Sequence, residues 1–306
     1  MRNRLFAAFV AVTALIALLV LAHPLLAQNA QRGGQRGAAQ TLAQPTPRLP
    51  DGRVNFGAPP GQKGFWLPNG RPILATPDVL PGSPDFEKFR INGTGDDPQG
   101  RAAPSGPPFP GKPKESEVPF QPWAKAIYQY RETNMFEPYI RCKPSGGARL
   151  YINPYGAEFV DMPELQTILQ FDGNLHSYRI IYMDGRPHPK DLVPSYYGHS
   201  VGHWEGDTLV VDTVGYNERF WMDREGMPHT EQLHLTERFT RTDFNTMKYE
   251  MRIDDPGAYT RPWTTGFFLR WNPGEMLEFI CQENNQVINV VGSPEQKADR
   301  GSPTVP

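Results

Sequence analysis

The second half of the chain alternates apolar and charged residues with a period of two. The clearest run is Met247, Lys248, Tyr249, Glu250, Met251, Arg252, Ile253 and Asp254. Successive side chains of a β-strand point to opposite faces, so this pattern places one face in a core and the other in water. The alternation predicts an antiparallel strand and directs this part of the chain toward a β fold.

Further strand-like segments follow one another along the same half of the chain. They are residues 165–171, 175–183, 199–205, 208–214, 232–241, 263–271 and 275–281. Turn signals separate several of them, at residues 172–173, 184–185, 206–207, 242–245 and 272–274. Short strands in hairpin order without helical crossovers predict a mainly β fold. We expect an antiparallel barrel or a strongly curved meander sheet, with a two-sheet sandwich as the alternative.

A single helix is expected ahead of the strands. Pro122 suits a first helical turn, and Trp123, Ala126, Ile127 and Tyr130 recur at helical spacing. We expect this apolar stripe to dock the helix on the β domain.

The region before the helix is rich in proline. Residues 45–122 hold 18 of the 33 prolines, and proline fixes φ and removes a backbone donor, which disfavours long helices and central strands. We interpret residues 51–121 as an extended arm laid over the folded domain, with a disordered spacer as the alternative. Residues 28–50 have few large apolar side chains and are expected to be flexible. The β domain then spans residues 122–285, with a tail at 286–306.

Residues 1–27 have the features of a signal peptide. A basic start, an apolar run and a small residue, Ala27, before Gln28 suit export and cleavage; a retained membrane anchor is the alternative. Removal of Arg2 and Arg4 with the leader leaves 29 basic and 33 acidic residues. This balance favours neither a nucleic-acid partner nor an anionic membrane surface. We expect a periplasmic or extracellular protein with no membrane partner after cleavage.

The chain has two cysteines, Cys142 and Cys281, and no C-x-x-C motif. In an oxidising compartment the two could pair and close a long loop. The alternative is two buried free thiols, and neither reading makes cysteine a catalytic candidate.

Six of the seven histidines lie within residues 176–234, where proton carriers and metal ligands are therefore concentrated. If residues 206–207 form a two-residue hairpin loop, His199, His203 and Asp212 share one strand face. Such a trio could hold a divalent metal, or the carboxylate could orient an imidazole as a general base. Because the opposite face is apolar, the alternative is that all three are solvated on the outside of the sheet.

Glu237 has inward parity in its strand, where an isolated carboxylate is costly unless it is paired or hydrogen-bonded. We weigh a structural ion pair with an arginine against a catalytic acid with a raised pKa. Glu237 joins His199 and Asp212 as a candidate catalytic residue. His234 has outward parity and is expected to be solvated.

Arg186 and His188 lie in a loop stiffened by one glycine and two prolines, and such a loop could bind an anionic group. Together with Trp204 and Asp207 they form the predicted ligand-binding set.

Several short motifs occur together over residues 120–285, including MDGRPHP at 183–189, GHSVG at 198–202 and WEGDTLVVD at 204–212. The combination resembles a family of exported bacterial proteins. The resemblance implies a single domain and brings no substrate, cofactor or catalytic residue. Family members commonly carry arginine where this chain has His203, which counts against a metal site that includes this residue. The hairpin order is also similar to calycin-type barrels of the lipocalin kind, an analogy of fold alone.

Three functions are compatible with these patterns. The first is binding of a small, partly apolar ligand in a barrel cavity, because the chain is rich in aromatics and lacks a G-x-S-x-G, Walker or H-E-x-x-H motif. The second is a hydrolase or isomerase that uses His199 with Asp212, whose cofactor, if it has one, would be a divalent metal. The third is a surface or assembly protein that engages a partner through the arm.

Overall fold

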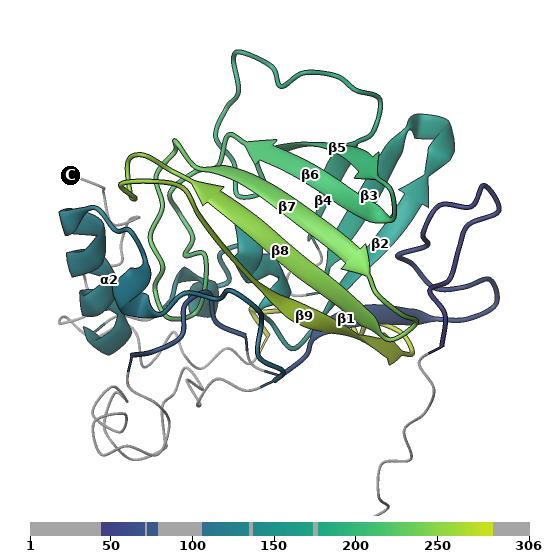
Figure 1. Ribbon diagram of the computed structural model, residues 1–306, viewed down its shortest axis with the longest axis horizontal. Helices are drawn as coiled ribbons and strands as arrows, with labels where there is room; N and C mark the ends of the chain where they lie inside the picture. The colour runs from purple at the N-terminus through teal and green to yellow at the C-terminus, as the bar shows by residue number, and fades with distance from the viewer. Residues whose placement is uncertain (1–43, 71, 79–105, 135–136, 174–176, 284–306) are drawn as a thin grey trace, which may run out of the picture. The chain divides into compact units, whose positions relative to one another are not determined.

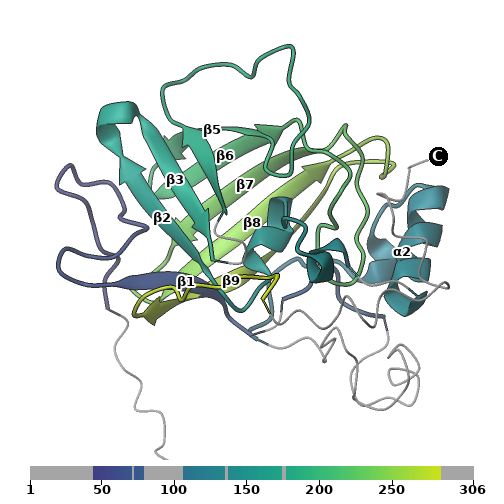
Figure 2. The same cartoon turned by 180° about the vertical axis from the view of Figure 1, so that it is seen from behind.

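Nine strands close into a barrel in a computed structural model that describes residues 44–70, 72–78, 106–134, 137–173 and 177–283 (Figures 1 and 2). The strands are β1 (Gly64–Pro68), β2 (Ala157–Met162), β3 (Thr167–Asp172), β4 (Ser177–Tyr182), β5 (His199–Glu205), β6 (Thr208–Val214), β7 (His234–Arg241), β8 (Thr246–Asp254) and β9 (Trp263–Pro273). Each strand pairs with its neighbours in chain order, and β9 returns to β1. The predicted mainly β fold is confirmed, as a closed barrel.

The remaining regular elements are helical. They are η3 (Glu115–Glu117), α2 (Pro122–Asn134), η4 (Pro138–Arg141), η5 (Gly147–Tyr151) and η6 (Pro163–Leu165). In the described ranges, no helix has the length and apolar character needed to cross a membrane. The predicted leader, most of the low-complexity segment, the tail at 286–306 and His176 lie outside these ranges.

Local alternation located most strands correctly. The hairpin at residues 206–207 has the expected register, with His199 opposite Val214 and Glu205 opposite Thr208. The segment at 275–281 was predicted as a strand, but the chain leaves the barrel after β9 and residues 275–280 have no regular structure. One pair of neighbouring strands, β4 and β5, is parallel. The two strands are joined by the long loop at residues 183–198.

The proline-rich arm contributes to the barrel itself. Its residues 64–68 form β1, which pairs with β9 along its length and with β2 at Trp66. The barrel therefore includes residues on both sides of the expected boundary between arm and domain at residues 121–122. The high proline content of the arm argued against a strand here. A strand of five residues needs only a few backbone hydrogen bonds, so it can still form in such a segment.

The arm is also held by a buried cation. Arg241 donates to the backbone carbonyls of Asn55 and Gly57, and its guanidinium lies 4.8 Å from the ring centroid of Trp66 and 5.0 Å from that of Trp271. Burial lowers the pKa of Arg241 to about 10. A charged group between two indole rings is stabilised by cation–π attraction and ties the arm to the barrel end.

Helix α2 lies where the sequence predicts it, but it buries a different face. Ala124 and Tyr128 are fully buried, whereas Tyr130 of the predicted stripe is 50% exposed. Arg131, one further turn along, is also buried and donates to the carbonyl of Gly226. The buried face of α2 is determined by the small Ala124 and by the contact of Arg131 with the distant Gly226. A search for large apolar residues at helical spacing does not detect either one.

Large aromatic side chains fill the barrel interior. Tyr151, from η5, packs between Phe239 and Tyr249 at centroid distances of 5.6 and 4.6 Å. Phe159 packs edge-on against Phe239, and Phe267 against Tyr249. Offset and edge-to-face contacts of this kind give a close-packed core.

Cys142 and Cys281 form a disulfide, with their Cα atoms 5.6 Å apart, as one of the two sequence readings expected. The bond joins the segment before η5 to the segment after β9, which are 139 residues apart. The loop that it closes contains β2 to β9, whereas β1 lies outside it.

Removal of this disulfide should destabilise the fold. In the chain-entropy model a loop of this length is worth about 4 to 5 kcal/mol, and measured values are often smaller. The double variant Cys142→Ser/Cys281→Ser should therefore unfold at a lower guanidinium concentration than the oxidised wild type. Reduced wild-type protein is the control and should match the variant; equal midpoints for the oxidised protein and the variant would contradict the prediction.

Candidate functional site

A line of hydrogen bonds crosses the outer face of the barrel. Asp212, on β6, accepts from His188 through Oδ1 at 2.8 Å and from His234 through Oδ2 at 2.6 Å. The other nitrogen of His188, Nδ1, lies 2.8 Å from Nδ1 of His199. Four side chains from three strands and one loop thus form a continuous group, which we call the His199 group.

The loop at residues 183–198 brings His188 to this face. Parallel strands cannot be joined by a tight turn, so the chain between β4 and β5 makes a long excursion (Figure 1). Gly185 adopts a φ of +75° at its first turn, which L-residues rarely adopt. Pro187 and Pro189 restrict the backbone on both sides of His188, and the hydrogen bonds to Asp212 and His199 fix its ring.

The pKa values within the His199 group shift in different directions. Burial alone would raise the pKa of Asp212, but the hydrogen bonds from His234 and His188 outweigh burial and lower it. The hydrogen bond to Asp212 raises the pKa of His234 above its usual value. Burial, followed by the neighbouring His188 and Arg186, lowers the pKa of His199. His199 is thus held neutral near pH 7, whereas the contact with Asp212 stabilises the charged form of His234.

These contacts define which atoms can do chemistry. If His188 donates its Nε2–H to Asp212, its Nδ1 accepts the Nδ1–H of His199, and Nε2 of His199 carries a lone pair. Among the described residues none hydrogen-bonds this Nε2. The ring is partly exposed and stacks on Tyr182 at a centroid distance of 5.1 Å. The arrangement leaves one oriented, neutral imidazole nitrogen at the protein surface.

His203 does not join the group. Its Nε2 contacts Glu205 at 3.2 Å, and its side chain is 61% exposed. Across the described ranges, no three histidine, cysteine, aspartate or glutamate side chains are placed to hold a metal ion together. The predicted metal set of His199, His203 and Asp212 is therefore not assembled, because side chains sharing a strand face can still turn to different partners.

The predicted ligand-binding residues fall in two places. Arg186 forms an ion pair with Asp184, and its guanidinium lies 4.0 Å from the ring centroid of Tyr182. It therefore borders the His199 group, to which His188 belongs. Asp207 instead forms an exposed ion pair with Arg48, which lies just before the arm.

Trp204 lies away from the His199 group and packs against the arm. Its ring stacks on Phe56 at a centroid distance of 5.5 Å. It also borders a cavity of about 20 Å³, which has room for little more than one water molecule. Its position is that of a packing residue between arm and barrel.

Glu237 lies inside the barrel and is fully buried. Arg179, on β4, donates to both of its carboxylate oxygens at 2.5 and 3.1 Å, and the Tyr249 hydroxyl donates at 2.8 Å. Burial alone would lower the pKa of Arg179, but the charge of Glu237 outweighs it and the pKa lies well above its ordinary value. Of the two readings of Glu237, the geometry favours the structural ion pair.

Sequence reasoning did not identify the arginine. Arg179 has inward parity in its strand and lies opposite Gln170. This inward position of an arginine was the one sequence feature that could have indicated a buried partner for Glu237. Parity shows that both charges face the core, but not that β4 and β7, three positions apart in the sheet order, place them in contact.

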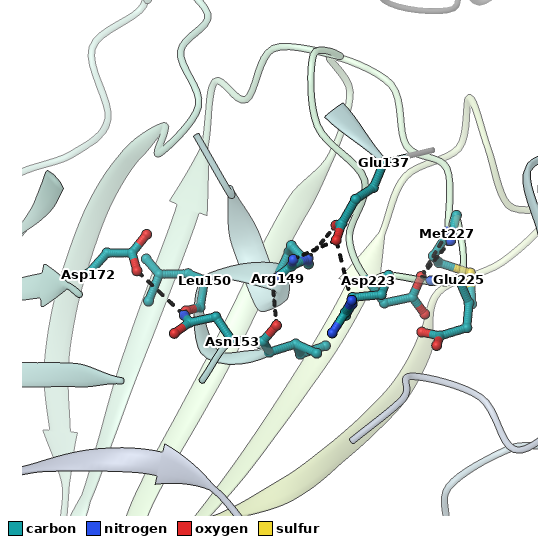
Figure 3. Close-up of polar contacts among 11 residues, drawn as sticks. Glu137, Arg149, Leu150, Asn153, Asp172, Asp223, Glu225 and Met227 are labelled. Atoms are coloured by element: carbon teal, nitrogen blue, oxygen red, sulfur yellow. Dashed lines mark hydrogen bonds and ion pairs between the residues drawn. The ribbon is translucent and has the colours of Figure 1, made fainter. Parts of the chain in front are cut away.

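A second buried ion pair lies among the loops (Figure 3). Arg149 of η5 donates to both carboxylate oxygens of Glu137 at 2.7 and 2.8 Å, and Arg224 lies 3.5 Å from the same carboxylate. The pair joins η5, which packs into the barrel, to the segment after α2. These charges lie in a short 3-10 helix and in loops, where no periodic sequence pattern reveals the pairing.

Asp223 stands beside this pair in Figure 3. Its Oδ1 accepts three backbone N–H groups of residues 225–227 at 2.9 to 3.1 Å. Burial, followed by the charge of Glu225, raises the pKa of Asp223 to about 7. The carboxylate shapes the loop in which it lies.

Loss of the buried carboxylate charge should destabilise the barrel strongly. Glu237→Gln leaves the Arg179 guanidinium without a counter-charge, which costs about 3 to 5 kcal/mol in comparable buried pairs. Glu250→Gln, which removes a surface partner of Lys248, is the matched control and should cost about 1 kcal/mol or less. Guanidinium unfolding measures both, and equal losses for the two variants would refute a stabilising role for the pair.

The Asp212–His234 contact should make stability depend on pH. The raised pKa of His234 gives a contribution that is complete below about pH 6.5 and is lost as pH rises through the folded value. The lowered pKa of Asp212 gives a contribution that is present above about pH 4 and is lost as pH falls.

Asp212→Asn should therefore lower the pKa of His234, measured by ¹H–¹⁵N NMR titration of the imidazole rings. The stability difference between wild type and this variant should shrink above the folded pKa of His234. His203→Gln is the control and should leave the titration of His234 unchanged; an unshifted His234 in Asp212→Asn would show that the contact does not control its charge.

Family models, curated proteins and solved structures contain no match to this chain. The resemblance to a family of exported bacterial proteins stays a prediction from the motifs. Function therefore has to be argued from the site, because a barrel fold alone hosts many activities.

Proposed function

We propose that this chain is an exported protein that binds a small ligand at His199 and transfers a proton to or from it, as a hydrolase or isomerase would. The observation that carries the proposal is the His199 group. One nitrogen of His199 is tied to His188 and Asp212, while the other lacks a partner among the described residues. An imidazole oriented in this way is the usual requirement for a general base.

The relay has a defined direction. Nε2 of His199 takes a proton from a bound hydroxyl or water, which makes the ring an imidazolium. Its Nδ1–H then points at Nδ1 of His188, and the Asp212 carboxylate stabilises positive charge on either ring. The lowered pKa of His199 keeps the base neutral near pH 7, so that it is ready to accept a proton.

The barrel interior is a weaker candidate for ligand binding. The described inward side chains pack on one another, and the Arg179–Glu237 pair is satisfied by Tyr249, Gln170 and Tyr151. A ligand there would have to displace a buried ion pair, which is strongly unfavourable. This favours the outer face over the cavity expected from the barrel analogy.

A second candidate is ligand binding without turnover at the same place. Arg186, Tyr182 and His199 stack in that order, which offers a cation and aromatic edges on one surface. This surface suits a partly apolar ligand with a polar group. Assembly through the arm is less favoured, because β1 and the arm's described residues pack on the chain's own barrel.

Export accords with two features. Residues 1–27 have the basic and apolar composition expected of a signal peptide, and the two cysteines are paired. Disulfides persist mainly in oxidising compartments. A periplasmic or extracellular site of action is therefore part of the proposal.

Hydrolysis of 4-nitrophenyl acetate provides a direct test of the base. His199→Gln should lower kcat/KM of the full chain by about a hundredfold, while His203→Gln, an exposed histidine on the same strand, should behave as wild type. The wild-type rate should rise with pH and level off below the ordinary histidine pKa of about 6.5.

Equal rates for wild type and His199→Gln would reject proton transfer at this residue. Binding without turnover is then judged by adding 4-nitrophenol and following the His199 ring by NMR. An unchanged His199 signal would remove the second candidate for this class of ligand.

A further inference from the structure

A cavity of about 250 Å³ lies outside the barrel, between β9 and two segments of the arm. Its walls are largely apolar and include Ile73, Phe109, Phe267 and Phe268. Phe109 lies directly on β9 because Gly266 has no side chain: a Cβ there would be 2.4 Å from the Phe109 ring. The cavity is therefore a built feature of how the arm packs on the strand.

Lys112 is the one charged residue among those that line this cavity. Its ammonium donates to the carbonyl of Ile73 at 2.5 Å. Across the described part of the chain, no carboxylate forms an ion pair with Lys112. An ammonium has three donors, so two remain without a hydrogen-bond partner among the residues that the structure describes.

The protein compensates the charge of Lys112 only in part. Burial lowers the pKa of Lys112 to about 8, although the charges of Asp223 and Glu225 act to raise it. Those two carboxylates are not among the residues that line the cavity. A partly buried cation beside an apolar space is stabilised by an anion that enters that space.

We propose that this cavity binds a small carboxylate with an apolar body. The carboxylate pairs with the Lys112 ammonium, and the hydrocarbon contacts Ile73, Phe109 and the outward-facing Phe268. The volume is below the roughly 300 Å³ at which pockets for drug-sized ligands begin, so the ligand is a short-chain or single-ring acid. The site shares no residue with the His199 group and does not depend on its function.

Isothermal titration of the oxidised full chain with hexanoate tests the proposal. We expect binding that strengthens about fourfold per methylene from butanoate to hexanoate, as burial of each CH₂ predicts. Hexanamide, which has the same shape and no charge, should bind at least about tenfold more weakly, because it cannot pair with the ammonium.

Variants then locate the site. Lys112→Met should weaken hexanoate to the level of hexanamide, whereas Lys125→Met, which alters an exposed lysine of α2, should leave it unchanged. His199→Gln should also leave hexanoate binding unchanged, which separates this site from the proposed catalytic one.

Three results would overturn the proposal. They are the absence of hexanoate binding below a Kd of about 10 mM, equal affinity for hexanamide, or unaltered affinity in Lys112→Met. The comparison of hexanoate with hexanamide uses wild-type protein, so it decides the question even where a variant does not fold.

Discussion

Closure of the barrel depends on β1, a strand of five residues in a proline-rich segment. An open sheet leaves backbone donors and acceptors unpaired at both edges, and here β1 occupies the seam between β2 and β9. Trp66 from this strand is buried inside and contacts Trp271 on β9. The packing of the arm on the barrel, the Trp66–Trp271 contact and the contacts of Arg241 with both rings all depend on the pairing of β1.

The barrel separates two kinds of polar chemistry. Inside, Arg179 and Glu237 satisfy each other and cannot respond to a ligand without a large loss of stability. Outside, Asp212 organises three histidines that remain partly exposed. A group that acts on other molecules must be both oriented and accessible, and only the outer group meets both conditions. The chain thus uses buried charge for architecture and partly exposed imidazole for its proposed chemistry.

Sequence reasoning reached the right strand face but not all of its members. The hairpin register placed His199 and Asp212 on one side, and the apolar opposite face indicated that this side is outward. His188 was assigned to a separate loop, because no local pattern shows where a 16-residue connection returns to the sheet. His234 was correctly given outward parity, yet it contacts Asp212 rather than being merely solvated. Partners across the sheet depend on strand order, which a single sequence does not display.

Taken alone, the sequence determined local features: most of the period-two strands, the turn at residues 206–207, the start of the helix at Pro122 and the parity of Asp212 and Glu237. Side-chain direction alternates along any strand, so these features need no knowledge of distant neighbours. Tertiary structure alone decided which strand closes the barrel, which arginine pairs with Glu237, and that His188 links Asp212 to His199. Each of these joins residues far apart in the chain, and such contacts are selected by the packing of the whole barrel rather than by local spacing.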